Sequence, residues 1–251
     1  MLIQSLLAAC AAVALVVIAA LAFRKYGTHD DEPDGPTVGH AGAMLSALFL
    51  LVFSIAIIVP WTTVDAARQN TYSEAQSLSE AYWTAGGLPP AERQVIRTGI
   101  TDYVRFVTGQ EWRQMGSGRL SEAGWQKLDA VRVALRGMRF TDDDTKAVRD
   151  NVGERIREVY AARRQRTVDA RAGLPSGVLV FTVITGLVMI IFPFLAGARP
   201  RGMALAPLVV MAMMLCICVY TVFHINHTFT GGLAVGPDAF TSALQGFARI
   251  P

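Results

Sequence analysis

Four long stretches without Asp, Glu, Lys or Arg constrain this chain more than any other feature of its sequence. They are residues 1–23, 35–64, 172–198 and 202–237. An α-helix needs about 20 apolar residues to cross the roughly 30 Å hydrocarbon core of a bilayer, and each stretch is longer than that. The sequence therefore predicts an all-α integral membrane protein with four transmembrane helices.

The predicted spans cover about residues 2–23, 41–59, 174–196 and 203–224, arranged as two hairpins. Pro60 and Trp61 are expected to end the second span, and a tight turn should join the third span to the fourth. No base precedes the first apolar run, so we expect a retained helix and not a secretory signal, which has a basic start. The predicted division of the chain is 1–64, 65–171, 172–226 and a tail, 227–251.

Most of the charge lies between the two hairpins. Residues 65–171 hold 18 of the 23 basic and 15 of the 20 acidic side chains, while the whole chain is only 17% charged. Apolar residues recur there at the three- and four-residue spacing of helices and never alternate as in strands. The sequence therefore predicts a helical extramembrane domain inserted between the second and third spans.

Local signals place the helices of this domain. The second span can continue as a polar helix to Thr84, where Gly86 and Gly87 stop it. Pro89–Pro90 should open the next helix, since proline fits a first helical turn, and Ser121 should begin another. Thr141, followed by three aspartates, should cap a last helix that continues without a break into the third span.

Basic residues in short loops indicate the sidedness of membrane proteins. The loops after the first span and between the last two contain four bases, and the opposite side has one; they are Arg24, Lys25, Arg199 and Arg201 against Arg249. This count favours a multi-pass protein of the bacterial inner membrane with its large domain extracytoplasmic. A run of arginines just before the third span favours the opposite arrangement, but long loops count little in the rule.

That arginine run is a candidate contact for lipid head groups or phosphate, because juxtamembrane bases attract anionic lipids. The residues are Arg163, Arg164, Arg166 and Arg171. The alternative is that they only flank a membrane helix. The acidic loop around His29 is either a weak cation site or a solvated loop.

Two further pairs are candidates. His224 and His227 are three residues apart, so on one helix face they could relay a proton or bind a metal; the alternative is hydration at the end of a helix. Phe49 and Phe53 are four apart in the second span and should stack on one helix face. They could form an aromatic pore constriction, or they could face lipid or the protein core.

Other functions lack support in the sequence. The net charge of +3 is too small and too dispersed to indicate nucleic-acid binding. All three cysteines lie in apolar runs, so no disulfide framework is expected. No nucleophile lies near a histidine base in the polar segment, and no phosphate-binding loop or zinc-protease motif is present. We therefore expect no enzyme, no cofactor and no resident metal.

The order of spans and several short motifs resemble the bestrophin-like-domain membrane proteins of bacteria, a family of unknown function. The matching positions are Glu111–Trp112, Met115, Gly118, Arg163, Arg166, Leu174–Pro175 and the closing element 232–244. The resemblance implies a distant link to true bestrophins, which are oligomeric anion channels, although no bestrophin pore or calcium-clasp motif is recognisable.

Two functions follow as hypotheses. The first is a homo-oligomeric ion channel, selective for anions, whose pore comes from the second span of several copies. The second is a non-catalytic accessory or scaffold subunit of a membrane complex that binds a partner through its helical domain. Both involve the lipid bilayer, and neither involves nucleic acid.

Overall fold

A computed structural model describes Ile18, residues 35–196 and residues 202–249. The first predicted span apart from Ile18, the acidic loop and the turn at 197–201 lie outside the described residues. The chain divides into two compact units, residues 1–61 with 174–226 and residues 62–173 with 227–251. We refer to them as the membrane unit and the helical unit.

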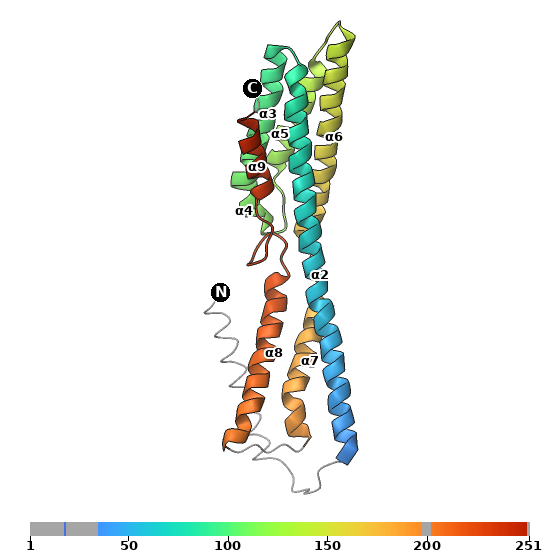
Figure 1. Ribbon diagram of the computed structural model, residues 1–251, viewed down its shortest axis with the longest axis vertical. Helices are drawn as coiled ribbons and strands as arrows, with labels where there is room; N and C mark the ends of the chain where they lie inside the picture. Colours follow the sequence, from blue (N-terminus) through green and yellow to red (C-terminus); the bar gives the residue numbers. More distant parts are fainter. Residues whose placement is uncertain (1–17, 19–34, 197–201, 250–251) are drawn as a thin grey trace. The chain divides into compact units, whose positions relative to one another are not determined.

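The described residues form helices and no strands, as the sequence predicts (Figure 1). The helices are α2 (Gly35–Thr84), α3 (Pro90–Phe106), α4 (Trp112–Met115), α5 (Glu122–Gly137), α6 (Asp143–Arg171), α7 (Ser176–Leu195), α8 (Ala206–Ile225) and α9 (Asp238–Phe247). Within the described part, three helical stretches are long and apolar enough to cross a membrane, and their apolar portions lie in α2, α7 and α8. This finding supports the membrane assignment.

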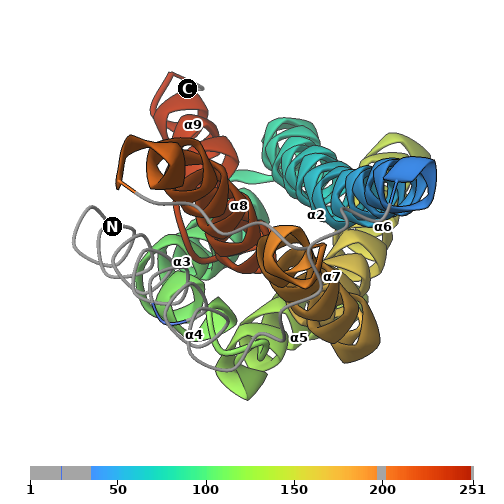
Figure 2. The same ribbon diagram turned by 90° about the horizontal axis from the view of Figure 1, so that it is seen from below.

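The membrane unit contains the first part of α2 together with α7 and α8, which Figure 2 shows end-on. Its largest core joins Phe49 of α2 to apolar side chains of α7 and α8: Ile190, Phe194, Ala212 and Leu215. The Asn226 side-chain oxygen accepts a hydrogen bond of 2.6 Å from the backbone N–H of Leu174. This bond ties the residue after α8 to the segment that leads into α7.

The helical unit packs the second part of α2 with α3, α5, α6 and α9 around one apolar core. Short α2 side chains such as Ala67 and Ala81 are completely buried there, so the neighbouring helices approach α2 closely. The tail belongs to this unit: α9 lies beside α3 in Figure 1, and Phe240 and Phe247 enter the core.

Helix α2 continues through Pro60 to Thr84, as the predicted polar extension of the second span requires. Proline removes one backbone hydrogen bond, but membrane helices tolerate it when neighbouring groups compensate. No glycine lies between Pro60 and Thr84, and the buried stripe continues beyond Pro60 through Val64 and Ala67. The predicted end of the helix at Thr84 is confirmed, and a short 3₁₀ turn covers Ala85–Gly87.

Helix α6 differs from the prediction at both ends. Its N-cap is Asp142 and not Thr141, because the Asp142 carboxylate accepts the backbone N–H groups of Asp144 and Thr145 at 3.0 and 3.1 Å. At its other end α6 stops at Arg171, and four non-helical residues separate it from α7. Pro175 explains this break, since a proline disfavours the helical conformation of the residue before it. The predicted starts at Pro90 and Ser121 are confirmed.

Candidate functional site

Five polar side chains with no exposed surface meet inside the helical unit. They are Glu74 of α2, Tyr103 of α3, Glu111, and Arg163 and Arg166 of α6. Glu111 is the last residue of a π-helical turn, Val107–Glu111, that links α3 to α4. We call these five residues the buried network.

Each charged member continues an apolar stripe of its own helix. Glu74 falls in the α2 series Ala67, Thr71, Glu74, Leu78 and Ala81, in which every member is completely buried. Glu111 extends the series Ile96, Ile100, Val104 and Val107, and Arg163 and Arg166 extend the series Val152, Ile156 and Val159. Because residues at this spacing share one helix face, packing the stripes together brings two acids and two bases into one core.

Arg163 and Glu111 form a two-pronged ion pair. The guanidinium nitrogens of Arg163 donate to the two carboxylate oxygens of Glu111 at 2.8 and 2.6 Å. The backbone N–H of Ser121 also donates to Glu111, at 3.2 Å, and Arg163 donates to the Ser121 carbonyl at 3.0 Å. The pair therefore anchors the loop before α5 as well as α6.

Arg166 makes the equivalent pair with Glu74. Its Nε and one terminal nitrogen donate to the Glu74 oxygens at 2.8 and 3.0 Å. Its other terminal nitrogen lies 3.1 Å from Glu111 Oε1 and 3.2 Å from the sulfur of Met115. The two ion pairs are thus joined into one network with two positive and two negative charges.

Tyr103 lies at the centre of the network. Its hydroxyl donates to Glu74 Oε1 at 2.5 Å and accepts from Arg163 at 3.0 Å and from Arg166 at 3.3 Å. Burial first, and the adjacent Glu74 carboxylate second, raise the pKa of Tyr103 far above its usual value. Tyr103 therefore stays protonated and neutral, which its role as donor to Glu74 requires.

Both arginines keep their charge. Burial alone would lower the pKa of Arg166, but the carboxylates of Glu74 and Glu111 outweigh burial and raise it. The pKa of Arg163 is raised in the same way, with the Glu111 hydrogen bonds overcoming burial. Aromatic rings cover the guanidinium groups: Trp125 lies 4.7 Å from that of Arg163, and Phe240 lies 5.2 Å from that of Arg166.

The chemistry of this network is structural. Its charges balance, its members are sealed from solvent, and nearly every polar atom in it has a partner, the exception being Arg163 Nε. No substrate reaches these groups in this conformation, and a paired network can shift pKa values without any catalytic role. The network instead fixes the second part of α2, α3 and α6 against one another.

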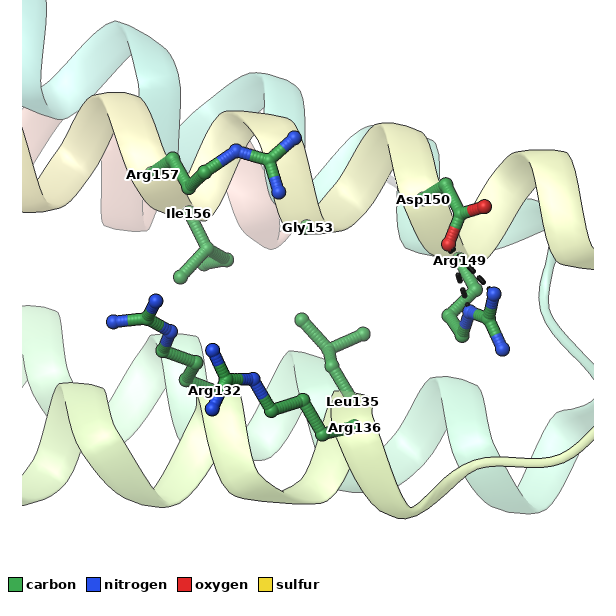
Figure 3. Close-up of a pocket in the computed structure, with 8 residues that line it drawn as sticks. All are labelled: Arg132, Leu135, Arg136, Arg149, Asp150, Gly153, Ile156 and Arg157. Carbon is green, nitrogen blue, oxygen red and sulfur yellow. Dashed lines mark hydrogen bonds and ion pairs between the residues drawn. The ribbon is translucent and has the colours of Figure 1, made fainter.

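A basic cleft between α5 and α6 is open to solvent (Figure 3). It has a volume of about 560 Å³, and its charged lining consists of Arg132, Arg136, Arg149, Arg157 and one acid, Asp150. Asp150 is already bound, because Nε and a terminal nitrogen of Arg149 donate to it at 2.9 and 2.7 Å. We call this feature the basic cleft.

The family model of the bestrophin-like domain matches residues 8–240, almost the whole chain and all five members of the buried network. The chain belongs to the bestrophin-like family. This finding confirms the resemblance seen in the sequence. No curated protein and no solved structure matches the chain.

The arginine run of this bestrophin-like protein splits between interior and surface. Arg163 and Arg166 are buried and held by carboxylates, which corrects the expectation that they contact lipid or phosphate. Arg164 and Arg171 are exposed and line a shallow, largely apolar cleft with Trp125, Thr167 and Val168. For these two residues the contact with lipid or phosphate stays a prediction.

The two histidines do not share a helix face. Helix α8 ends at Ile225, so His224 lies in its last turn while His227 lies beyond it, in the helical unit. The ring of His224 stacks on Tyr220 at 5.7 Å. In the described part of the chain, no group of three His, Cys, Asp or Glu side chains could hold a metal.

Phe49 and Phe53 do stack on one face of α2, with ring centroids 5.7 Å apart. Phe49, however, is only 5% exposed, because Ile190, Phe194 and Leu215 cover it within the same chain. Its ring is therefore not free to line an opening between copies, and the pore assignment is corrected for Phe49.

Proposed function

We propose that this bestrophin-like protein is a non-catalytic accessory subunit of a membrane complex in the bacterial inner membrane. Its apolar helices hold it in the bilayer, and its helical unit binds an acidic segment of a partner protein in the basic cleft. The observation that carries the proposal is the composition of that cleft, four arginines to one carboxylate.

The arginines of the basic cleft differ in whether they already form ion pairs within the chain. Arg149 is paired with Asp150, and Arg157 is paired with Glu154. The guanidinium of Arg132 lies 5.2 Å from the ring of Tyr160, and Arg136 has no ion pair with any described residue. In Figure 3, Arg132 and Arg136 extend from α5 into the space below α6. These two guanidinium groups are therefore the best placed to bind carboxylates of a partner.

A non-catalytic role is consistent with where the ionisable groups lie. The strongly perturbed groups of an enzyme normally face a cleft that substrate can enter. Here the groups with the largest pKa shifts, Tyr103 and Arg166, are sealed in the core. The charged groups that face solvent, such as the arginines of the basic cleft, are suited to binding a partner.

Co-purification from native membranes tests the proposal. The wild-type chain should migrate on native gels with a stoichiometric partner that is released by raised salt, because exposed charge pairs are screened. The double substitution Arg132→Gln with Arg136→Gln should lose the partner. The matched control is Arg105→Gln with Arg113→Gln, two exposed arginines outside the cleft, which should retain it. A wild-type chain that migrates as a lone monomer would contradict the proposal.

Sidedness belongs to the same proposal. The short-loop charge count supports an extracytoplasmic helical unit. No cysteine lies between residues 62 and 173, so Ser117→Cys at an exposed turn gives a single reporter there. A membrane-impermeant maleimide should label it at the cell surface once the outer membrane is permeabilised, and labelling only after lysis would reverse the assignment.

A homo-oligomeric anion channel is the second candidate function. The specific observation is a row of exposed aliphatic side chains at three- and four-residue spacing on α2: Met44, Leu48, Leu51, Ile55 and Ile58. Such a row suits contact between helices of several copies as well as contact with lipid. Liposomes containing the purified protein should release chloride if it conducts; silent liposomes with an intact oligomer would eliminate this candidate.

A further inference from the structure

A second solvent-exposed pocket lies in the helical unit where three chain segments meet. They are the turn after α4, the end of α6 and the first residues of the tail, and the pocket has a volume of about 580 Å³. The pocket is distinct from the basic cleft and shares no residue with it. We call it the tail pocket.

Two glycines shape the tail pocket. Gly118 has a positive φ of 74°, and a side chain there would meet the Ala170 carbonyl at 3.4 Å. A methyl group on Gly116 would overlap the methyl of Thr230. Glycine therefore lets the turn approach both α6 and the tail. A backbone hydrogen bond of 2.9 Å from Val235 to Thr228 closes the tail segment.

The tail pocket carries only positive charge. Its ionisable lining residues are Arg119, Arg171 and His227, and it contains no Asp or Glu. All three side chains are exposed, and none has an ion pair or side-chain hydrogen bond to another described residue. This contrasts with the basic cleft, where two of the four arginines are already neutralised.

Only a few residues separate the lining of the tail pocket from two membrane helices along the chain. Arg171 precedes Ser176, the first residue of α7, by five positions, and His227 follows Ile225, the last residue of α8, by two. Since a chain extends at most about 3.6 Å per residue, these residues lie within about 18 Å and 7 Å of the helix ends. The head-group layer of a bilayer is itself several ångströms thick on each side.

We propose that the tail pocket binds the phosphate group of an anionic phospholipid. Arginine forks match phosphate oxygens and bind them in pairs, and an imidazole adds a further donor. Hydroxyls of Ser117 and Thr230 also line the pocket. The few residues that link the pocket to α7 and α8 along the chain favour a lipid head group over free phosphate as the source of that phosphate, because anionic head groups attract basic residues that flank membrane helices.

Thermal unfolding of the full chain in a neutral detergent tests the proposal. Phosphatidylglycerol should raise the melting midpoint of the wild type, while phosphatidylcholine and inorganic phosphate should raise it much less. Arg119→Gln with Arg171→Gln should weaken the apparent affinity for phosphatidylglycerol about tenfold or more, since each charge-assisted hydrogen bond contributes about 1.5–3 kcal/mol. Both side chains are exposed, so the helix content measured by circular dichroism should not change.

Two controls make the outcomes decisive. Arg105→Gln with Arg113→Gln removes the same charge elsewhere on the helical unit and should keep the phosphatidylglycerol response. An equal loss in this control, or wild-type affinity in the pocket variant, would overturn the proposal. Inorganic phosphate could also raise the melting midpoint as much as phosphatidylglycerol does, with the increase lost in the pocket variant. That result would show that the pocket binds free phosphate and would overturn the assignment of a lipid head group.

Discussion

Replacing Glu111 with Gln should destabilise the helical unit strongly although the side chain keeps its shape. Glu111 accepts two bonds from Arg163, lies 3.1 Å from Arg166 and accepts the Ser121 N–H. The amide would turn a donor toward arginine donors and leave one buried positive charge uncompensated. Removing one partner of a buried ion pair costs about 3–5 kcal/mol. For a unit of this size that corresponds to a melting-point decrease on the order of 10–20 °C.

Trp112 and Trp125 supply the assay, because they lie 5.9 Å and 4.7 Å from the guanidinium groups of Arg166 and Arg163. Their fluorescence during heating in detergent should report unfolding of this region directly. The matched control is Glu154→Gln, the same chemical change in an exposed pair, and it should leave the midpoint unchanged because exposed pairs contribute little.

The double variant Glu111→Gln with Arg163→Met tests the reasoning itself. It removes the unpaired charge, so it should melt above the single Glu111→Gln variant, as expected when a buried pair is replaced as a unit. A double variant that loses the sum of the two single effects would refute the idea that charge balance in the core is what matters. Equal midpoints for Glu111→Gln and Glu154→Gln would refute it as well.

Three further predictions concern stability, each measured as a melting midpoint. Gly124→Ala should lower the midpoint although alanine favours helices, because the new methyl group would overlap the Arg163–Glu111 pair. Gly153→Ala has open space and should raise the free energy of unfolding by up to about 1 kcal/mol. A higher midpoint in both variants would contradict this reasoning. Burial, followed by a hydrogen bond to a carboxylate, raises the pKa of Tyr160 to about 12. The stabilising contribution of the Tyr160 hydroxyl should therefore be complete below about pH 10 and disappear as the pH rises toward 12. Tyr160→Phe should reduce this alkaline decrease of the melting midpoint. An unchanged dependence of the midpoint on alkaline pH would contradict this. Hydrogen bonds from the first turn of α6 lower the pKa of Asp142, so its stabilising effect should persist above about pH 4 and be lost at lower pH. Asp142→Ala should remove the part of the stability that is lost on acidification. The same dependence of the midpoint on acid pH in both proteins would count against the cap.

Helix ends in the helical unit were predictable wherever a local signal sets them. Pro90 at the start of α3, Ser121 before α5 and the glycines after Thr84 act within one turn of the chain. The continuation of α2 through Pro60 was also predictable, since the polar sequence up to Thr84 contains no glycine. The error at the start of α6 is a shift of one residue: Asp142 replaces Thr141 as the cap because its carboxylate accepts two N–H groups.

The buried network was missed because its residues were interpreted by charge and not by position. At about 100° per residue, Arg163 and Arg166 are about 60° apart on α6 and continue the stripe of Val152, Ile156 and Val159. Arg164 and Arg171 fall about 80–100° away from Arg163, on the side that the structure exposes. The helical spacing of the sequence thus separates the two buried arginines from the two exposed ones, but only the fold shows that Glu111 and Glu74 pair with the buried arginines.

The neutral network also determines what the rest of the domain presents to its surroundings. Residues 65–171 contain 18 bases and 15 acids, and the network removes two of each from the surface, which leaves 16 and 13 there. The excess of three positive charges therefore lies entirely outside the core. It is not spread evenly, because the basic cleft and the tail pocket together contain six arginines of this segment and one acid. Since Arg163 and Arg166 are neutralised internally, we expect the strongest attraction of this domain for acidic partners or lipids at these two sites. Substitutions in one site should then leave binding at the other unchanged.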